Sequence, residues 1–193
     1  LSGGQSFFER SEIKDLTSYL RLLANREDDQ AFIRAVTTPR RGVGAGTLQA
    51  LGGYAGERHL PLFSAAREQG FAQRVQARQL APLLDFADFV ERFRQRAASE
   101  PVAPVLRDLL AAIDYEKWLF EQEDAATARG RMANVQDFCD WMIRKGEEEQ
   151  KTLLDLTQTI ALISLLDQDS ADSDAVQLST LHAAKGLEFK HVF

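Results

Sequence analysis

Apolar residues recur at helical spacing along most of this 193-residue chain, and this periodicity constrains its fold more than any other feature. The first run follows Ser11, a residue type that caps helix N-termini well, and predicts an amphipathic helix from Ser11 to about Leu23. A short second helix, predicted over 30–36, ends before Pro39 because the residue that precedes a proline avoids the helical region. Later apolar runs predict helices over about 48–55, 62–68, 80–97, 102–113, 132–143 and 153–163. The bulk of the chain is therefore predicted to be an all-α domain.

Only the end of the chain departs from this period. Val176–Thr180 alternates apolar with polar residues, and His191–Phe193 follows a turn that contains glycine, so both segments are predicted to be strands. The polar, acidic stretch 167–175 before them is predicted to be a linker. Because the sequence starts without methionine and stops inside a predicted strand, we expect it to be a piece of a longer protein.

The composition fits an ordinary soluble globular protein, with 45% hydrophobic and 27% charged residues. The longest apolar runs, such as Ile160–Leu166, are much shorter than the roughly 18 to 20 residues that a membrane span needs. The single cysteine, Cys139, cannot form an internal disulfide, and no secretory signal is recognisable at the N-terminus. A reducing cytoplasm is the expected compartment.

The charge of the chain is unevenly distributed. A net charge of −6 argues weakly against nucleic-acid binding, because lysine and arginine supply phosphate contacts. Residues 147–174 hold eight acidic residues and one lysine, whereas residues 30–56 hold three arginines and no acid. A local basic surface is therefore expected within an acidic chain.

Several catalytic motifs are missing from the sequence. It has no G-x-x-x-x-G-K-[ST] phosphate loop, no cysteine or histidine cluster with metal-ligand spacing, and no G-x-S-x-G nucleophile elbow. We therefore expect neither a self-contained enzyme nor a metal site.

Residues 38–47 lie between two predicted helices and form the first candidate site. Gly42 and Gly44 let backbone N–H groups point outward, and the following helix start adds unpaired donors and the positive end of its dipole. With Arg40, Arg41 and the Thr47 hydroxyl, this turn suits a nucleic-acid backbone phosphate and reads no base sequence. The alternative is a plain helical hairpin whose glycines only permit a tight turn.

Residues 177–189 run from a predicted strand through a turn of small residues into a second strand. This order brings Thr180, His182, Lys185 and Glu188 together at a strand end, where open α/β sheets tend to bind ligands. A ligand site and a structural turn are about equally consistent with these residues. For the N-terminal segment 3–15, a capped helix with a charged face is the simpler interpretation.

Three segments, in chain order, resemble motifs of the UvrD/Rep/PcrA group of superfamily-1 DNA helicases. Residues 180–189, Thr-Leu-His-Ala-Ala-Lys-Gly-Leu-Glu-Phe, are similar to motif V of these helicases. Residues 6–15 and 32–44 resemble two further segments of the same proteins, and the helical middle with Asp114–Leu119 is most similar to the Rep branch. The resemblance covers essentially the whole chain.

The resemblance implies a mainly α fragment centred on the helical 2B subdomain, which contains a helix-hairpin-helix-like turn. Residues 1–24 and 176–193 would be short helix and strand pieces of the RecA-like α/β subdomain 2A, and residues 25–175 the 2B insertion. Family members use ATP to move 3′ to 5′ on single-stranded DNA, and they unwind duplexes in replication and repair. The expected partners are DNA, the remaining subdomains 1A, 1B and the rest of 2A, and a replication or repair protein.

Carried over by motif, the resemblance also implies site residues. The expected duplex contacts are Arg40, Arg41, Gly42, Gly44 and Thr47. Thr180 and His182 would contact single-stranded DNA, Glu188 would meet the ribose of ATP, and Gly186 would shape that turn.

The chain departs from a complete helicase of this family. The phosphate loop, the Mg²⁺-binding acidic motif and the arginine finger are missing, so this polypeptide alone is expected to bind no ATP or Mg²⁺ and to be inactive. Thr37 and Lys190 stand where the family commonly has Asn and Pro. An alternative hypothesis is a protein–protein interaction and regulatory helical module that does not bind DNA directly.

Overall fold

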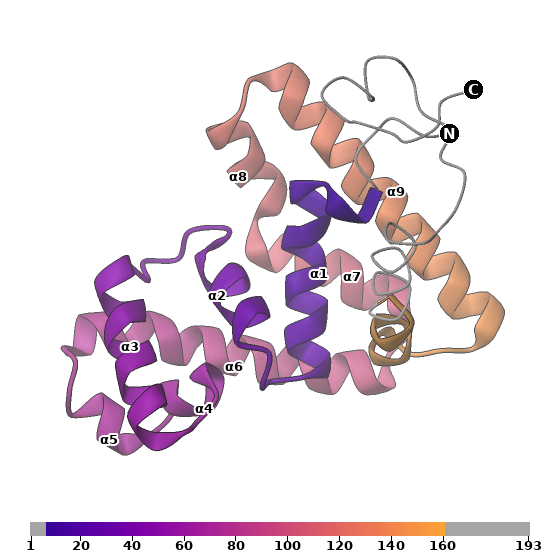
Figure 1. Ribbon diagram of the computed structural model, residues 1–193. Coiled ribbons are helices and arrows are strands. Elements are labelled where there is room, and N and C mark those ends of the chain that lie inside the picture. The colour runs from indigo at the N-terminus through magenta and orange to yellow at the C-terminus, as the bar shows by residue number, and fades with distance from the viewer. Residues whose placement is uncertain (1–6, 161–193) are drawn as a thin grey trace, which may run out of the picture.

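The computed structural model describes residues 7–160, and helices account for most of this part of the chain (Figure 1). The elements are η1 (Phe7–Glu9), α1 (Ser11–Ala24), α2 (Asp29–Thr37), α3 (Ala45–Arg58), α4 (Leu62–Ala66), α5 (Gln69–Ala72), α6 (Ala77–Ser99), α7 (Val102–Ile113), α8 (Tyr115–Gln122) and α9 (Ala125–Glu149). Residues 153–160 are helical as well, and no strand occurs within 7–160. The predicted mainly α class is confirmed.

The long helix α6 connects two groups of helices (Figure 1). Helices α3, α4 and α5 gather near its N-terminal end, where α4 packs on α6. Helices α7, α8 and α9 pack on one another at the other end, where α7 contacts α6. Helix α1 lies between the two groups and contacts α2, α6 and α9, so it is the central helix of the described body.

An aromatic cluster fills the core where α1, α2, α4 and α6 meet. Phe32 of α2 lies 5.8 Å from Phe86 of α6 and 6.4 Å from Phe63 of α4, measured between ring centroids. Tyr19 of α1 meets Phe86 and Phe89 edge-on at 6.4 and 6.2 Å. Edge-to-face pairs at these distances are favourable beyond the area they bury, so the cluster holds four helices in one arrangement.

The core between α7, α8 and α9 is mostly aliphatic. Leu109 and Val105 of α7 are fully buried against α9, which contributes Val135 and Met142.

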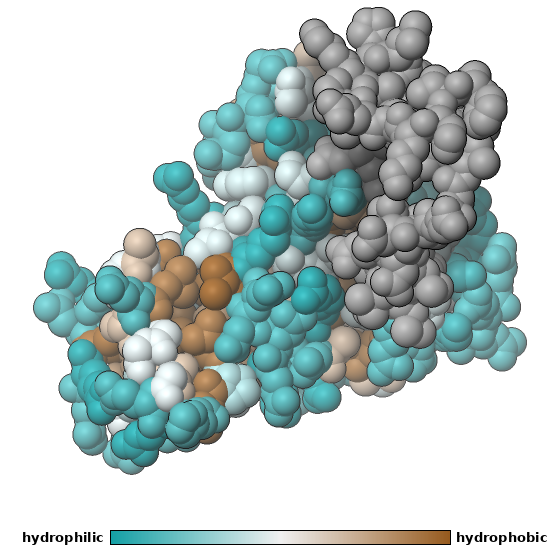
Figure 2. All heavy atoms as spheres, viewed as in Figure 1, coloured by the Kyte–Doolittle hydropathy of each residue, from teal (hydrophilic) through white to brown (hydrophobic). Residues whose placement is uncertain are grey.

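Hydrophilic residues cover much of the surface, while hydrophobic residues gather toward α3 and α4 in the view of Figure 2.

Acidic side chains fix several helix starts. Asp28 caps α2 by accepting from the N–H of Ala31 at 3.0 Å, and Asp124 caps α9 through the N–H groups of Ala126 and Thr127. Asp29 of α2 accepts from the first N–H of α4, that of Leu62, at 2.8 Å. This last bond ties α4 to α2 across the chain.

The helices differ from the sequence predictions at several ends. Ser11 was expected to cap α1, but Arg10 occupies the N-cap position and the Ser11 hydroxyl donates to Glu12 instead. Helix α3 begins at Ala45, three residues earlier than predicted, because Ala45 and Gly46 carry no apolar side chain that periodicity could detect. The predicted helix 62–68 ends at residue 66 and is followed by the separate α5, and α8 was not predicted.

The subdomain boundaries at residues 24 and 175 stay predictions. Within the described residues α1 is not a peripheral piece, because its buried face is shared among α2, α6 and α9. Residues 161–193 lie outside the described part, and with them the predicted linker and both predicted strands.

Candidate nucleic-acid interface

The turn between α2 and α3 is shaped by a proline and a glycine. Helix α2 ends at Thr37, and the Thr38–Pro39 peptide that follows is cis. Gly42 has a φ of 82°, a left-handed backbone conformation that residues other than glycine adopt only with strain. The chain is thereby turned back so that α3 can begin at Ala45, with Gly44 at its N-cap.

The first turn of α3 presents unpaired backbone donors. Gly44 caps the helix without a side chain, and the first bond of the helix runs from the Leu48 N–H to the Gly44 carbonyl at 3.1 Å. The N–H groups of residues 45–47 have no acceptor among residues 7–160. A Cβ added at Gly44 or Gly46 would meet no atom within 4 Å. Ala45 and Gly46 are exposed, whereas Thr47 is buried, so the first two donors are the accessible ones at the positive end of a helix dipole, the arrangement that binds anions.

The two arginines of the turn point in different directions. The Arg40 side chain is exposed and forms no ion pair within the described part of the chain. Arg41 is half-buried, with its guanidinium carbon 4.9 Å from the ring centre of Phe86 and 5.7 Å from those of Tyr19 and Phe89. Only Arg40 is placed as a freely accessible cation.

Thr47 is also turned inward. The whole residue is 5% exposed, and its hydroxyl oxygen accepts a long, 3.4 Å hydrogen bond from Gln79 of α6. Gln79 also accepts from the N–H of Gln76 in the capping box of α6. Thr47 therefore presents little surface to a ligand, and the exposed residues at the start of α3 are Ala45 and Gly46.

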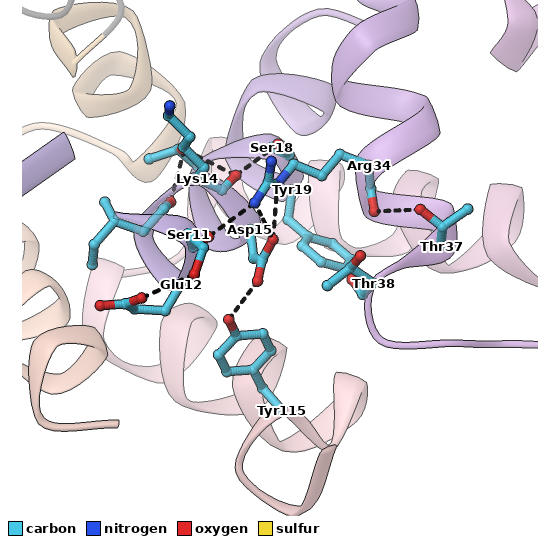
Figure 3. A network of polar contacts seen from close by, with 12 residues as sticks. Ser11, Glu12, Lys14, Asp15, Ser18, Tyr19, Arg34, Thr37, Thr38 and Tyr115 are labelled. Carbon is cyan, nitrogen blue, oxygen red and sulfur yellow. Dashed lines mark hydrogen bonds and ion pairs between the residues drawn. The ribbon is translucent and has the colours of Figure 1, made fainter. Parts of the chain in front are cut away.

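A buried charge network fixes α2 on α1 and α8 (Figure 3). Asp15 of α1 has a 6% exposed side chain and accepts from Arg34 of α2 at 2.7 Å. It also accepts from the hydroxyl of Tyr115 at 2.7 Å, while Arg34 reaches the Ser11 carbonyl at 3.1 Å. Burial raises the pKa of Tyr115 and the charge of Asp15 raises it further, so this phenol remains a donor. The network fixes the orientation of α2, and with it the point at which the turn begins.

A polar cavity of about 500 Å³ lies beside this network, and most of its lining comes from the segment 6–15 that resembles the helicases. Its lining is formed by Glu9, Arg10, Ser11, Glu12, Lys14, Arg34 and Arg131. Arg10 donates to the side-chain oxygen of Asn134, and the amide of Asn134 donates to Glu12 at 2.7 Å. Its lining holds four basic and two acidic side chains, so the acidic groups neutralise part of the positive charge.

Sequence reasoning identified the turn but not the residues that support it. Gln79 and Pro82 of α6 and Tyr19 of α1 touch the turn from helices distant in sequence. Nothing in their local pattern distinguishes them from other helical residues, so no sequence signal could have found them. The predicted residues Thr180, His182, Gly186 and Glu188 lie outside the described residues.

The described residues contain neither a metal-binding cluster nor a membrane-spanning helix. No group of three or more histidine, cysteine, aspartate or glutamate side chains within 7–160 is arranged to hold a metal ion. None of the described helices is both long enough and apolar enough to cross a membrane.

Comparison with known proteins places the chain in a family. The family model described as "UvrD-like helicase C-terminal domain" matches residues 1–193. The chain belongs to the UvrD-like helicase C-terminal domain family. This assignment agrees with the resemblance of residues 6–15, 32–44 and 180–189 to UvrD/Rep/PcrA helicases.

Individual members of this family are similar along the whole chain. The ATP-dependent DNA helicase Rep of Salmonella typhimurium is 43% identical over 100% of the chain and 30% of its own length. DNA helicase II of Escherichia coli is 37% identical over 99% of the chain and 27% of its own length. The ATP-dependent DNA helicase PcrA of Bacillus subtilis is 36% identical over 99% and 26%. The chain thus spans about 30% or less of the length of these relatives.

Proposed function

We propose that this chain is the 2B subdomain, with flanking pieces of 2A, of an ATP-dependent 3′ to 5′ DNA helicase of the Rep type. Its role is to contact duplex DNA and to regulate the motor that the other subdomains form. The similarity to Rep, DNA helicase II and PcrA along the whole chain supports the helicase assignment. A cytoplasmic location, as predicted from composition, agrees with it.

One observation carries the duplex contact: the unpaired N–H groups of the exposed residues Ala45 and Gly46 belong to the same turn as the exposed Arg40. Backbone donors and one flexible cation recognise phosphate oxygens and give no information about base sequence. Such a contact is weak, independent of sequence and sensitive to salt. This is the behaviour that a helicase needs from a surface that slides along duplex DNA.

ATP and Mg²⁺ belong to the complete helicase in this proposal. Glu188 would accept a hydrogen bond from the ribose and Gly186 would shape the turn beside it, while Thr180 and His182 would contact single-stranded DNA. The triphosphate and the metal would be held by subdomains outside this sequence, which lacks the phosphate loop. The chain alone is therefore expected to release no phosphate from ATP, with or without DNA.

Fluorescence anisotropy tests the duplex contact. The purified chain is titrated into labelled duplex, forked and single-stranded DNA at two salt concentrations, with a second duplex of unrelated sequence as control. We expect duplex and forked DNA to bind, equally for both sequences and more weakly at the higher salt. An affinity that does not depend on salt concentration, or no binding to any DNA, would instead favour the protein-interaction hypothesis.

A further inference from the structure

Arg41 is held among aromatic rings on the inner side of the turn. Its guanidinium carbon lies 4.9 Å from the ring centre of Phe86 and 5.7 Å from that of Phe89, both on α6. The ring of Tyr19 on α1 is a third neighbour, at 5.7 Å. An arginine over aromatic faces is attracted by their negative charge density, more strongly where water is excluded. These contacts attach the turn to α1 and α6.

A chain of two hydrogen bonds reinforces this attachment. Arg41 donates through Nη2 to the hydroxyl of Tyr19, and that hydroxyl donates to the backbone carbonyl of Thr38 at 2.7 Å. Burial raises the pKa of Tyr19, so the phenol keeps the proton that it gives to Thr38. One buried hydroxyl on α1 therefore binds both ends of the stretch 38–41 (Figure 3 shows Tyr19 beside Thr38).

Arg41 is poorly suited to leave this site for a phosphate. Its Nε is buried and has no hydrogen-bond acceptor among the described residues, which places that edge of the guanidinium away from any ligand. Moving the side chain outward would break the bond to Tyr19 and expose the faces of Phe86 and Phe89. Adjacent Arg40, in contrast, is already exposed.

We propose that Arg41 is a positioning residue for the duplex contact and not a contact itself. Together with Tyr19 it fixes residues 38–42 so that Arg40 and the N–H groups of Ala45 and Gly46 face the same side. This inference rests on the proposed function in one respect, namely that the turn between α2 and α3 binds DNA.

The test compares three variants of the full chain: Arg41→Lys, Arg41→Ala and Tyr19→Phe. Arg41→Lys keeps the charge but loses the planar group that stacks and donates as a fork. Tyr19→Phe keeps the ring and removes only the hydroxyl that links Arg41 to Thr38. The control is Val105→Ala, a fully buried position on α7 that does not touch the turn. All affinities are measured well below the melting temperature of every variant.

Two readouts are expected to change together. Without DNA, hydrogen exchange at the amides of Thr38 and Leu48, which bond to the carbonyls of Arg34 and Gly44 at the two ends of the turn, should become about tenfold faster in all three variants and stay unchanged in the control. Duplex affinity should fall by about tenfold in Arg41→Lys and Tyr19→Phe as well as in Arg41→Ala. A loss in Tyr19→Phe would be decisive support, since a buried tyrosine cannot touch DNA.

Direct phosphate binding by Arg41 predicts a different pattern. Arg41→Lys would then bind almost as tightly as the wild type, and Tyr19→Phe would bind normally, because the charge is retained in both. That result, or unchanged exchange at the amides of Thr38 and Leu48, would overturn the proposal. If the wild-type chain binds no duplex, the proposed function fails, while the exchange experiment still decides whether Arg41 positions the turn.

Discussion

Replacing Gly46 with alanine separates the stability of α3 from the proposed contact of its first turn with DNA. Gly46 is the second residue of α3, and Gly52 lies in the middle of the same helix. Both are exposed, and a Cβ added at either would meet no atom within 4 Å. The two substitutions therefore add the same methyl group to the same helix without a clash. Only the one at Gly46 adds it beside the unpaired N–H groups.

The expected magnitudes follow from this difference in position. Alanine in place of an exposed glycine inside a helix stabilises it by about 0.5–1 kcal/mol. For a chain of this size Gly52→Ala should raise Tm by about 1 to 4 °C. Gly46→Ala should leave Tm unchanged or raise it slightly. Its methyl group should keep a phosphate from at least one backbone donor, which weakens duplex binding by about tenfold.

Thermal melting and fluorescence anisotropy on the two variants test this reasoning. Gly52→Ala should melt higher and bind duplex as the wild type does, whereas Gly46→Ala should bind more weakly with no loss of Tm. Equal duplex affinity in the two variants would refute a phosphate contact at the start of α3. A lower Tm for Gly46→Ala would show that a methyl group at residue 46 does clash with neighbouring atoms.

Three further predictions concern other parts of the chain. Arg40→Ala should reduce the slope of log affinity against log salt concentration by about 1, equally for duplexes of unrelated sequence. The control Arg129→Ala, at an exposed position on α9, should leave that slope unchanged. An effect that depends on DNA sequence would contradict a contact with the DNA backbone. Tyr115→Phe removes a hydrogen bond to the buried Asp15 and should lower Tm by about 3 to 12 °C. In the control Tyr54→Phe, Tm should not fall, because the buried hydroxyl of Tyr54 has no hydrogen-bond partner among the described residues. Burial raises the pKa of the Cys139 thiol to about 12, so the reactive thiolate is scarce at pH 8. An aromatic disulfide reagent should therefore label the folded chain far more slowly than the denatured chain. Equal labelling rates would contradict the buried position.

Periodicity predicted the helices that bury an apolar stripe. Helix α7 was predicted with its observed bounds, and α1 and α2 to within one residue at every end. It failed where side chains carry no pattern, as at Ala45 and Gly46, where α3 begins. Short helices such as α5 were missed because four residues are too few to display a period.

The candidate site was predicted only in its local part. Proline and glycine chemistry located the turn at residues 38–47, since both residue types act on the backbone beside them. The direction of each arginine depends on which rings lie beneath the turn. Those rings, Tyr19, Phe86 and Phe89, come from α1 and α6, far away in the sequence. Only the tertiary structure could therefore distinguish the inward Arg41 from the exposed Arg40.

The most direct test of the central claim is a ¹H–¹⁵N NMR titration of the chain with a short duplex. In the proposed function, the first turn of α3 is the surface that meets the DNA backbone. The amides of Gly44 and Gly46 should then shift as duplex is added, and less so at high salt. The amides of Gly130 and Gly146 on α9 should stay in place. Shifts confined to α9, or none at the turn while the duplex is bound, would contradict the account.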